Sequence, residues 1–375
     1  MRKLNRRNFL VNAGLSASGA LLLGSWPAMA SKYLTSDVSK YPLGKRVIDA
    51  HIHVHAETID RAIRVMDQNY IVFGNSIGLT KNDFNAFAKA YLPFKDRLGA
   101  MYRYDWTPWQ SSAKFIQSAP DELEAAVEKG ALGVKIWKDL GLTVKDEKGQ
   151  LVAIDDERLM PIWERAEKLN CIVAFHTVDP VAFFEPWNEH NERWEELELH
   201  PDWSFADQSK YPSRTSVLEQ RNNVIKAFPN LKFQCVHMAN YSENFDIIDN
   251  WMQEMPNMML DTSARLGELG RQDPAVGKAF FEKYQDRIMF GTDRMFRPDG
   301  DVQGAGPKKY FTKEEDNRFY EAHWRYFQTE SRGVDHPTPI QGNWDIDGIG
   351  LDEQVVKKIY WDNAYQYYNL KSQGV

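Results

Sequence analysis

The sequence is poor in several features that would assign it to a particular class of protein. It has only two cysteines, Cys171 and Cys235, each inside an apolar run, so we expect buried free thiols rather than a disulfide. Its formal net charge of −7 argues against an electrostatic grip on nucleic acid. An anionic substrate would therefore have to be bound by locally placed arginine or lysine. We also find no internal repeat and no low-complexity segment.

The N-terminal segment has the pattern of an export signal. Arg6 and Arg7 precede an apolar stretch at 13–24, and Ala28 and Ala30 follow it as small residues. This pattern resembles a twin-arginine signal. The apolar stretch is shorter than the roughly 20 residues needed to span a bilayer, which argues against a stable membrane anchor. We therefore predict a signal at 1–30, cleavage after Ala30, the twin-arginine export machinery as a partner, and a periplasmic or secreted protein.

Short β-rich runs alternate with amphipathic helical stretches after a polar leader at 31–45. This alternation is typical of a parallel sheet with crossover helices, and the chain length suits one large barrel. The sequence therefore predicts an α/β fold, a single (β/α)8 TIM barrel. The eight expected strands lie at 46–53, 70–77, 98–104, 132–137, 171–177, 233–238, 258–263 and 287–292.

Helices are expected between the strands, for example at 121–129 and at 157–169, with Asp155 or Asp156 as the cap of the second. Two intervals break the rhythm, at 179–213 and 294–350, and predict insertions after strands 5 and 8. Such segments extend from the catalytic end of a barrel and could form a lid or a specificity wall. The aromatic residues of the first interval could equally serve only to pin a long loop; they include Phe183, Phe184, Trp187, Trp194 and Trp203.

Candidate metal ligands lie where strands should end. The run VIDAHIH closes the first strand with His51 and His53, whose side chains point the same way because residues alternate faces along a strand. His176, His237 and Asp293 end or follow the fifth, sixth and eighth strands. Catalytic groups of a barrel come from the carboxyl ends of several strands, so residues far apart in the chain can converge on one ion.

This arrangement resembles the amidohydrolase superfamily, with HxH on strand one, histidines on strands five and six, and aspartate on strand eight. The phrases GVKIWKDLGL, FHTVDPVAFFEP and FGTD are similar to the amidohydrolase-related branch, which includes lactonases and nonoxidative decarboxylases of the aminocarboxymuconate-semialdehyde type. The resemblance covers residues 46–370, including Asn363 and Ala364 in the expected final helix.

The resemblance implies one divalent metal ion held by His51, His53, His176 and Asp293. Imidazoles and one carboxylate suit zinc, with manganese as an alternative, and a single ion is expected rather than two. Asp293 would also take the proton of the metal's water, as its counterpart does in the related enzymes. His237 would act as a catalytic acid or base, although it could instead bind a second metal or be a satisfied barrel histidine.

Three cationic residues are candidates for binding the substrate. Lys135 ends the fourth strand, where it could bind a substrate carboxylate, carry a carbamate between two ions, or pair with a neighbouring acid. Arg265 and Arg103 follow or end neighbouring strands, and arginine matches the geometry of a carboxylate. Surface ion pairs would explain the two arginines about as well.

The leading hypothesis is a metal-dependent hydrolase that attacks a lactone, ester or amide through metal-bound hydroxide. The alternative is nonoxidative decarboxylation on the same site, and a third hypothesis is a periplasmic binding protein without turnover. The expected partner is a small, possibly anionic molecule, with a homodimer left open because members of this branch are often dimers.

Overall fold

The computed structural model describes residues 42–375, so the predicted export signal and most of the leader lie outside the described residues. The twin-arginine signal and the cleavage after Ala30 therefore stay predictions. Within residues 42–375, no helix combines the length and the apolar character needed to cross a bilayer.

One parallel sheet forms the centre of the described chain. Its strands follow one another in the order β8-β7-β6-β5-β4-β3-β2-β1-β9, and every neighbouring pair is parallel. The strands are β1 (Val47–Val54), β2 (Ile71–Leu79), β3 (Leu98–Arg103), β4 (Gly133–Ile136), β5 (Ile172–Phe175), β6 (Lys232–Cys235), β7 (Met258–Asp261), β8 (Ile288–Met289) and β9 (Arg294–Phe296). Consecutive strands along the chain are therefore neighbours in space, as a barrel requires.

The strands β8 and β9 are two parts of the eighth barrel strand, and they close the barrel. β8 pairs with β7, whereas β9 pairs with β1. Between them, the Ala50 amide donates to the Phe290 carbonyl (2.8 Å) and the Asp293 amide donates to the His51 carbonyl (2.8 Å). The predicted barrel is thus confirmed. The predicted eighth strand was too short, because residues 294–296 still pair with β1 instead of starting the insertion.

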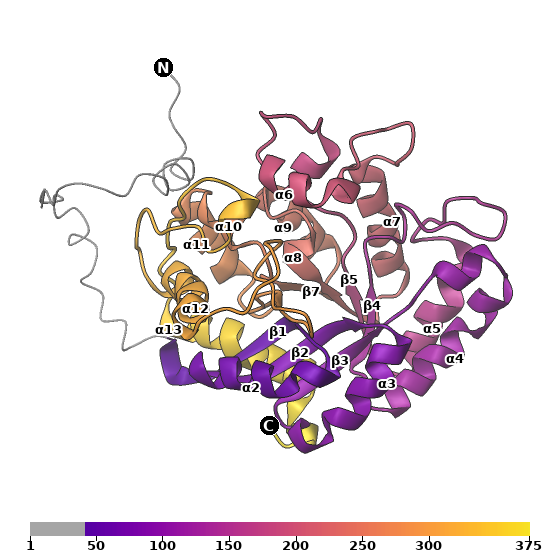
Figure 1. Cartoon of the computed structure of the whole chain (residues 1–375), viewed down its shortest axis with the longest axis horizontal. Helices are drawn as coiled ribbons and strands as arrows, with labels where there is room; N and C mark the ends of the chain where they lie inside the picture. Colours follow the sequence, from indigo (N-terminus) through magenta and orange to yellow (C-terminus); the bar gives the residue numbers. More distant parts are fainter. Residues whose placement is uncertain (1–41) are drawn as a thin grey trace, which may run out of the picture. The chain divides into compact units, whose positions relative to one another are not determined.

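Helices surround the strands, as Figure 1 shows. They are α2 (Ile59–Gln68), α3 (Lys81–Ala90), α4 (Lys114–Glu128), α5 (Met160–Lys168), α6 (Trp194–Leu199), α7 (Arg214–Ala227), α8 (Val236–Ala239), α9 (Phe245–Glu254), α10 (Leu266–Gly270), α11 (Pro274–Lys283), α12 (Lys313–Gln328), α13 (Glu353–Lys357) and α14 (Asn363–Tyr367). The helix predicted at 121–129 begins earlier, at Lys114, and continues through Pro120. Asp156 caps the segment before α5 by accepting a hydrogen bond from the Arg158 amide.

The segments after β5 and after the eighth strand contact each other. His200 of the first approaches the Ala305 carbonyl of the second (3.1 Å). Phe183 and Trp203 stack on one another, with ring centroids 6.1 Å apart. Phe183 is buried whereas Trp187 is 39% exposed, so only part of the aromatic set pins this segment to the core. Both cysteines are buried and free, as predicted.

Candidate metal centre and active site

The polar residues predicted to end the strands gather at the carboxyl end of the barrel. His51 and His53 lie in the second half of β1, Lys135 lies in β4, and His176, His237 and Asp293 follow β5, β6 and β8. All six side chains are at most part-exposed, because the ends of parallel strands meet inside the ring of helices. This end of the barrel is therefore the candidate site.

His51, His53 and Asp293 form the compact part of the site. His53 Nε2 lies 2.9 Å from Asp293 Oδ1, and His51 Nε2 lies 3.5 Å from the same oxygen. One ligand atom from each residue falls within 4.8 Å of the other two. Burial lowers the pKa of His53 to about 4, so its imidazole is neutral at pH 7. Although burial alone would raise it, the two histidines hold the pKa of Asp293 below its usual value.

Asp49 ties together the two strands that carry this cluster. Its carboxylate accepts hydrogen bonds from the Thr292 hydroxyl (2.6 Å), the Thr292 amide (3.1 Å) and the His51 amide (3.1 Å). Burial raises the pKa of Asp49 to about 7. Asp293 itself has a left-handed backbone, with a φ of 62°, which turns its side chain out of the strand direction. These contacts make Asp49 a support of the site.

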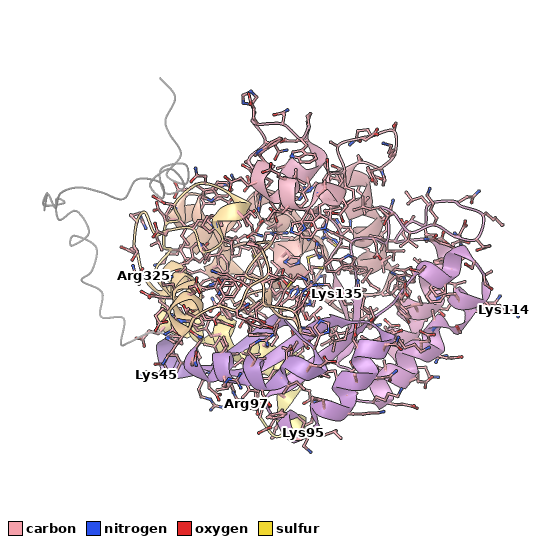
Figure 2. The ribbon with its side chains drawn as sticks, in the orientation of Figure 1. Lys45, Lys95, Arg97, Lys114, Lys135 and Arg325 are labelled. Atoms are coloured by element: carbon pink, nitrogen blue, oxygen red, sulfur yellow. The ribbon has the colours of Figure 1, made fainter. Side chains whose placement is uncertain are left out.

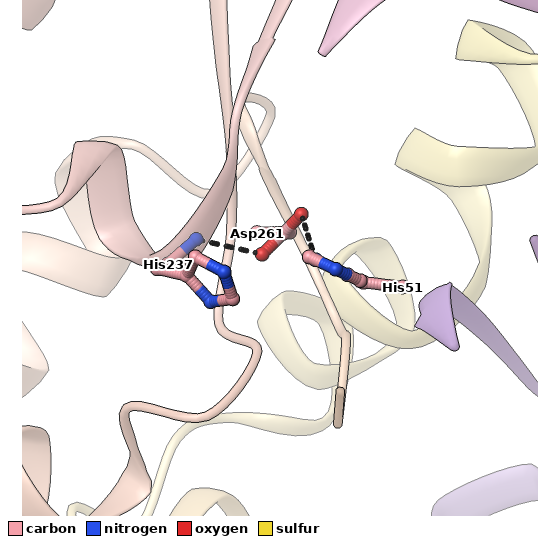
Figure 3. A group of neighbouring side chains, drawn as sticks. All are labelled: His51, His237 and Asp261. Atoms are coloured by element: carbon pink, nitrogen blue, oxygen red, sulfur yellow. Dashed lines mark hydrogen bonds and ion pairs between the residues drawn. The ribbon is translucent and has the colours of Figure 1, made fainter. Parts of the chain in front are cut away.

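Asp261 fixes the orientation of His51 from the opposite side (Figure 3). Asp261 Oδ2 lies 3.3 Å from His51 Nδ1, and Asp261 Oδ1 accepts from the Ser263 hydroxyl (2.5 Å). That hydroxyl also lies 2.8 Å from His51 Nδ1. Because the Ser263 proton is given to the carboxylate, the remaining proton must be on His51 Nδ1. His51 Nε2 is thus the nitrogen with a free lone pair, and it is the one that faces Asp293.

His237 is held as a neutral imidazole with a defined tautomer. Its Nδ1 lies 2.9 Å from the Ser263 carbonyl, which can only accept, so Nδ1 carries the proton. Burial is the main cause that lowers the pKa of His237 well below its usual value. The ring centroid lies 4.9 Å from that of His51 and 4.5 Å from that of His176. The Nε2 atom is left as the nitrogen that could exchange a proton with a substrate.

His176 lies beside His237 but outside the compact cluster. Its Nε2 approaches Asp179 Oδ1 at 3.3 Å, and Asp179 forms a buried ion pair with Lys138. Its Nδ1 is buried and has no hydrogen-bond partner in the described part of the chain. Burial lowers the pKa of His176 to about 3, which leaves a neutral ring suited to a metal. The role of His176 as a ligand stays a prediction.

Lys135 is a fully buried lysine of β4. Figure 2 places it at the centre of the molecule, whereas the other labelled lysines and arginines lie towards the outside. Its side chain is 0% exposed, and within residues 42–375 its Nζ has no hydrogen-bond partner. Burial lowers the pKa of Lys135 to about 8. Asp261 and Asp293 lie close enough for their charges to favour the protonated form of Lys135, but no carboxylate of residues 42–375 accepts a hydrogen bond from its Nζ.

Arg103 and Arg265 lie on two sides of the site. Arg103 pairs with Lys135 across β3 and β4, and both side chains pass near Gly78, where His53 also lies. The Arg103 Nε is buried and unpartnered among the described residues. Arg265 follows β7, is only 5% exposed, and donates to the neighbouring Ala264 carbonyl (2.9 Å). Within residues 42–375 neither arginine belongs to a surface ion pair, which leaves both as candidates for an anion.

The donor set fits a divalent ion. Two imidazole nitrogens converge on one oxygen of Asp293, and the second nitrogen of His51 is hydrogen-bonded near Asp261. A carboxylate behind a histidine is the usual support of a metal ligand, since it fixes the ring and the tautomer. His51, His237 and Asp261 form a second close group. Its carboxylate already accepts from Gln234 (2.8 Å) and the His237 amide (3.0 Å), so we interpret it as support rather than as a second metal site.

Sequence reasoning missed four residues that shape the site, namely Asp261, Ser263, Lys138 and Asp179. Asp261 is the last residue of β7, just as His176 and Asp293 come directly after or shortly after their strands. The same signal, a polar residue at a strand end, could therefore have identified Asp261. Ser263, Lys138 and Asp179 lie in loops, and their contacts depend on residues from other strands. No local pattern marks such residues.

A family model described as amidohydrolase matches residues 48–370. No curated protein sequence matches the chain. Among solved structures, a dihydroxybenzoic acid decarboxylase of a Polaromonas species, with bound manganese and the inhibitor 2-nitroresorcinol, is 16% identical, with a TM-score of 0.50, over 87% of this chain and 97% of that one. A 2,6-dihydroxybenzoate decarboxylase, bound to 2,6-dihydroxybenzoate, is 16% identical, with a TM-score of 0.49, over 83% and 88%.

A 4-oxalomesaconate hydratase of Rhodopseudomonas palustris is 15% identical, with a TM-score of 0.47, over 85% of this chain and 83% of that one. At such identities the likeness to solved structures concerns the fold. The family model, in contrast, spans most of the chain, from the first barrel strand to the last helix. The chain therefore belongs to the amidohydrolase family.

Proposed function

We propose that the chain catalyses the metal-dependent, nonoxidative decarboxylation of a small organic carboxylate. The observation that carries this proposal is the buried ammonium of Lys135, which has no hydrogen-bond partner among residues 42–375 and lies beside the His51, His53 and Asp293 cluster. A desolvated cation without a partner is costly, and a carboxylate brought in by the substrate would offset that cost. A neutral ester or amide would leave the ammonium unpaired.

Arg103 supports the same substrate class. It lies beside Lys135 on the neighbouring strand, and its buried Nε has no partner in residues 42–375. A guanidinium can hold a carboxylate through two parallel hydrogen bonds. Arg265 offers a further cation near His237, whose pKa its charge helps to lower. These positions favour a substrate whose acidic group enters between β3 and β4.

His51, His53 and Asp293, together with His176, would hold the ion, which we expect to be zinc or manganese. When bound, the ion would supply a Lewis acid that draws electron density from the substrate. His51 and His53 are neutral donors in this scheme, and Asp293 balances part of the metal's charge. The Polaromonas relative, described as a decarboxylase with bound manganese, is consistent with this choice of metal and reaction.

His237 is the proposed catalytic acid. In the reaction, the bond to the carboxylate carbon breaks, carbon dioxide leaves, and the electron pair stays on the remaining carbon. That carbon must then take one proton. His237 Nε2 carries no proton in the resting site, so it would take one from a solvent molecule and pass it to that carbon, while Nδ1 stays fixed by the Ser263 carbonyl. The ring lies between His51 and His176. The hydroxide left by the solvent molecule balances the step.

Hydrolysis, the leading hypothesis from the sequence, would use the same residues and stays a prediction. Export to the periplasm is also a proposal and would bring the enzyme into contact with substrates outside the cytoplasm. The two reactions differ in their products rather than in their metal site. The test must therefore identify the products and show where hydrogen and oxygen from water are incorporated, because loss of substrate alone does not separate the two reactions.

The test uses the full chain loaded with zinc or manganese and a panel of aromatic carboxylates, lactones and esters. The reactions are run in deuterated water and, separately, in ¹⁸O-labelled water. Carbon dioxide release with one deuterium on the remaining carbon supports decarboxylation. Release of acid with ¹⁸O and without carbon dioxide would establish hydrolysis instead. Binding without any product would favour the non-catalytic binding protein.

A further inference from the structure

Four consecutive residues after β6 have a left-handed backbone. The φ angles of His237, Met238, Ala239 and Asn240 are 56°, 54°, 53° and 57°. None of them is glycine, and L side chains disfavour this conformation because Cβ comes too close to the following carbonyl. A run of this kind persists only where its surroundings hold it in place. The contacts of this left-handed turn, residues 237–240, therefore matter for the position of His237.

Two of these contacts come from the inner side of the barrel. Asp261 accepts a hydrogen bond from the His237 amide (3.0 Å), as Figure 3 shows. The Asn240 side chain accepts from the Thr177 amide (2.9 Å). Since Thr177 directly follows His176, this bond joins the left-handed turn to the chain that carries the neighbouring histidine.

The other contacts come from two buried arginines of α7. Arg221 is 0% exposed, and its Nη1 donates to the Ala239 carbonyl (2.6 Å). Its Nε and Nη2 donate to Asn222 Oδ1 (3.1 and 2.8 Å). The guanidinium group of Arg221 is therefore held in place by a residue of the same helix. Arg214 donates to the Asn240 carbonyl and to the Asp179 carbonyl (3.0 Å). The arginines thus bind carbonyls that a left-handed turn presents outward.

We infer that Arg221 is a positioning residue: it holds the Ala239 carbonyl, keeps residues 237–240 left-handed, and thereby fixes the His237 imidazole between His51 and His176. Arg221 reaches the site only through the backbone of the left-handed turn. The inference rests on the proposed function only where it gives His237 the role of the acid. The geometry that it concerns exists without substrate or metal.

The test follows the Nδ1 proton of His237 in the metal-free full chain by ¹⁵N–¹H spectra of the histidine side chains. The Ser263 carbonyl protects this proton, and its loss in H237Q assigns the signal. We expect R221M to lose the signal and R221K to keep it with faster exchange. The matched control is R287M, which removes another arginine that donates to backbone carbonyls, at the opposite end of the barrel. Its His237 signal should be unchanged.

A signal that persists in R221M, or that disappears equally in R287M, would overturn the inference. Because the readout needs no turnover, a failure of the proposed function would not affect it.

A second pair of variants covers the case in which R221M does not fold. Ala239 and Ala166 are both fully buried, but Ala239 is left-handed and Ala166 lies in the right-handed helix α5. Glycine accepts a left-handed backbone and weakens an ordinary helix. We expect A239G to keep or raise the melting temperature and A166G to lower it by several degrees. An equal loss in both would show that the left-handed turn is not under strain and would contradict the inference.

Discussion

The two ends of the barrel strands differ in how far their buried polar groups are hydrogen-bonded. At the amino end, Arg287 donates to the carbonyls of Met252, Met255 and Met258, and Asn257 and Asn363 donate to further carbonyls. At the carboxyl end, Lys135 Nζ, His176 Nδ1 and Arg103 Nε are buried without partners among the described residues. Left-handed non-glycine residues occur at both ends, for example Tyr70 and Asn170 before β2 and β5, but the run of four consecutive ones at 237–240 lies at the carboxyl end.

This difference teaches that the amino end is arranged for stability and the carboxyl end for binding. Buried polar groups are normally hydrogen-bonded, because an unsatisfied one costs about 1–3 kcal/mol. Left-handed non-glycine residues add roughly 1–2 kcal/mol each. Such costs persist where a ligand completes the missing contacts, so substitutions at the two ends should have opposite effects on stability and on binding.

The largest effect is expected for Asp293→Ala, which removes the carboxylate on which His51 and His53 converge. Loss of one member of a catalytic unit lowers kcat by on the order of 10⁴-fold. Product formation on a substrate found in the labelled-water panel measures this. The control is D299A, an exposed aspartate paired with Lys308 on the following loop, which should retain activity. We expect D293A to bind the substrate without turning it over. Full activity in D293A would show that Asp293 has no part in the mechanism.

Lys135→Met should stabilise the protein while it abolishes binding of an anionic substrate. Burial lowers the pKa of Lys135 from 10.5 to about 8, so below pH 8 the folded state carries a charge that it disfavours. Between pH 8 and 10.5 the unfolded chain holds a proton that the folded chain lacks, and the stability of the wild type rises over this window. K135M should therefore be more stable by up to about 3 kcal/mol below pH 8.

Urea unfolding of both proteins at several pH values checks this expectation. The gap between K135M and the wild type should close as the pH rises from 8 to 10.5. The exposed Lys95, labelled in Figure 2, provides the control K95M, whose stability should differ little from the wild type at any pH. A K135M protein that is less stable than the wild type at pH 7 would show that Lys135 has a favourable partner.

Arg287→Met should have the opposite pattern at the amino end. It leaves three backbone carbonyls without their donor, so we expect a loss of about 2 kcal/mol in unfolding free energy. The kcat and KM of the folded protein should not change, because the lost contacts lie at the far end of the strands. An activity loss as large as that of K135M would break the distinction between the two ends.

Lys138→Met tests how firmly His176 is held, and the smallest effect is expected here. Without its cation, the buried Asp179 loses its ion pair and no longer orients the His176 ring. Removing such a support typically lowers metal affinity by about tenfold. Titration with zinc, compared with K210M, which breaks an exposed ion pair to Asp207 in the same insertion, measures the effect. Equal affinities would argue against His176 as a ligand.

The sequence predicted the barrel, and it placed most residues of the candidate site at strand ends, because these signals are local. A strand that ends in His51 and His53 presents both side chains on one face whatever the rest of the chain does. His237 and Asp293 could likewise be placed at strand ends. The contacts that orient them could not be predicted, because Asp261, Ser263 and Arg221 act through residues on other elements. The split eighth strand was also missed, since the left-handed Asp293 interrupts its pattern.

The most direct test of the metal centre is a titration of the metal-free full chain with zinc or manganese, with elemental analysis of the bound ion. We predict one ion per chain in the wild type, strongly weakened binding in H53A, and unchanged binding in H55A, which replaces a histidine just after β1 outside the cluster. No bound ion in the wild type, or equal binding in H53A and H55A, would contradict the account.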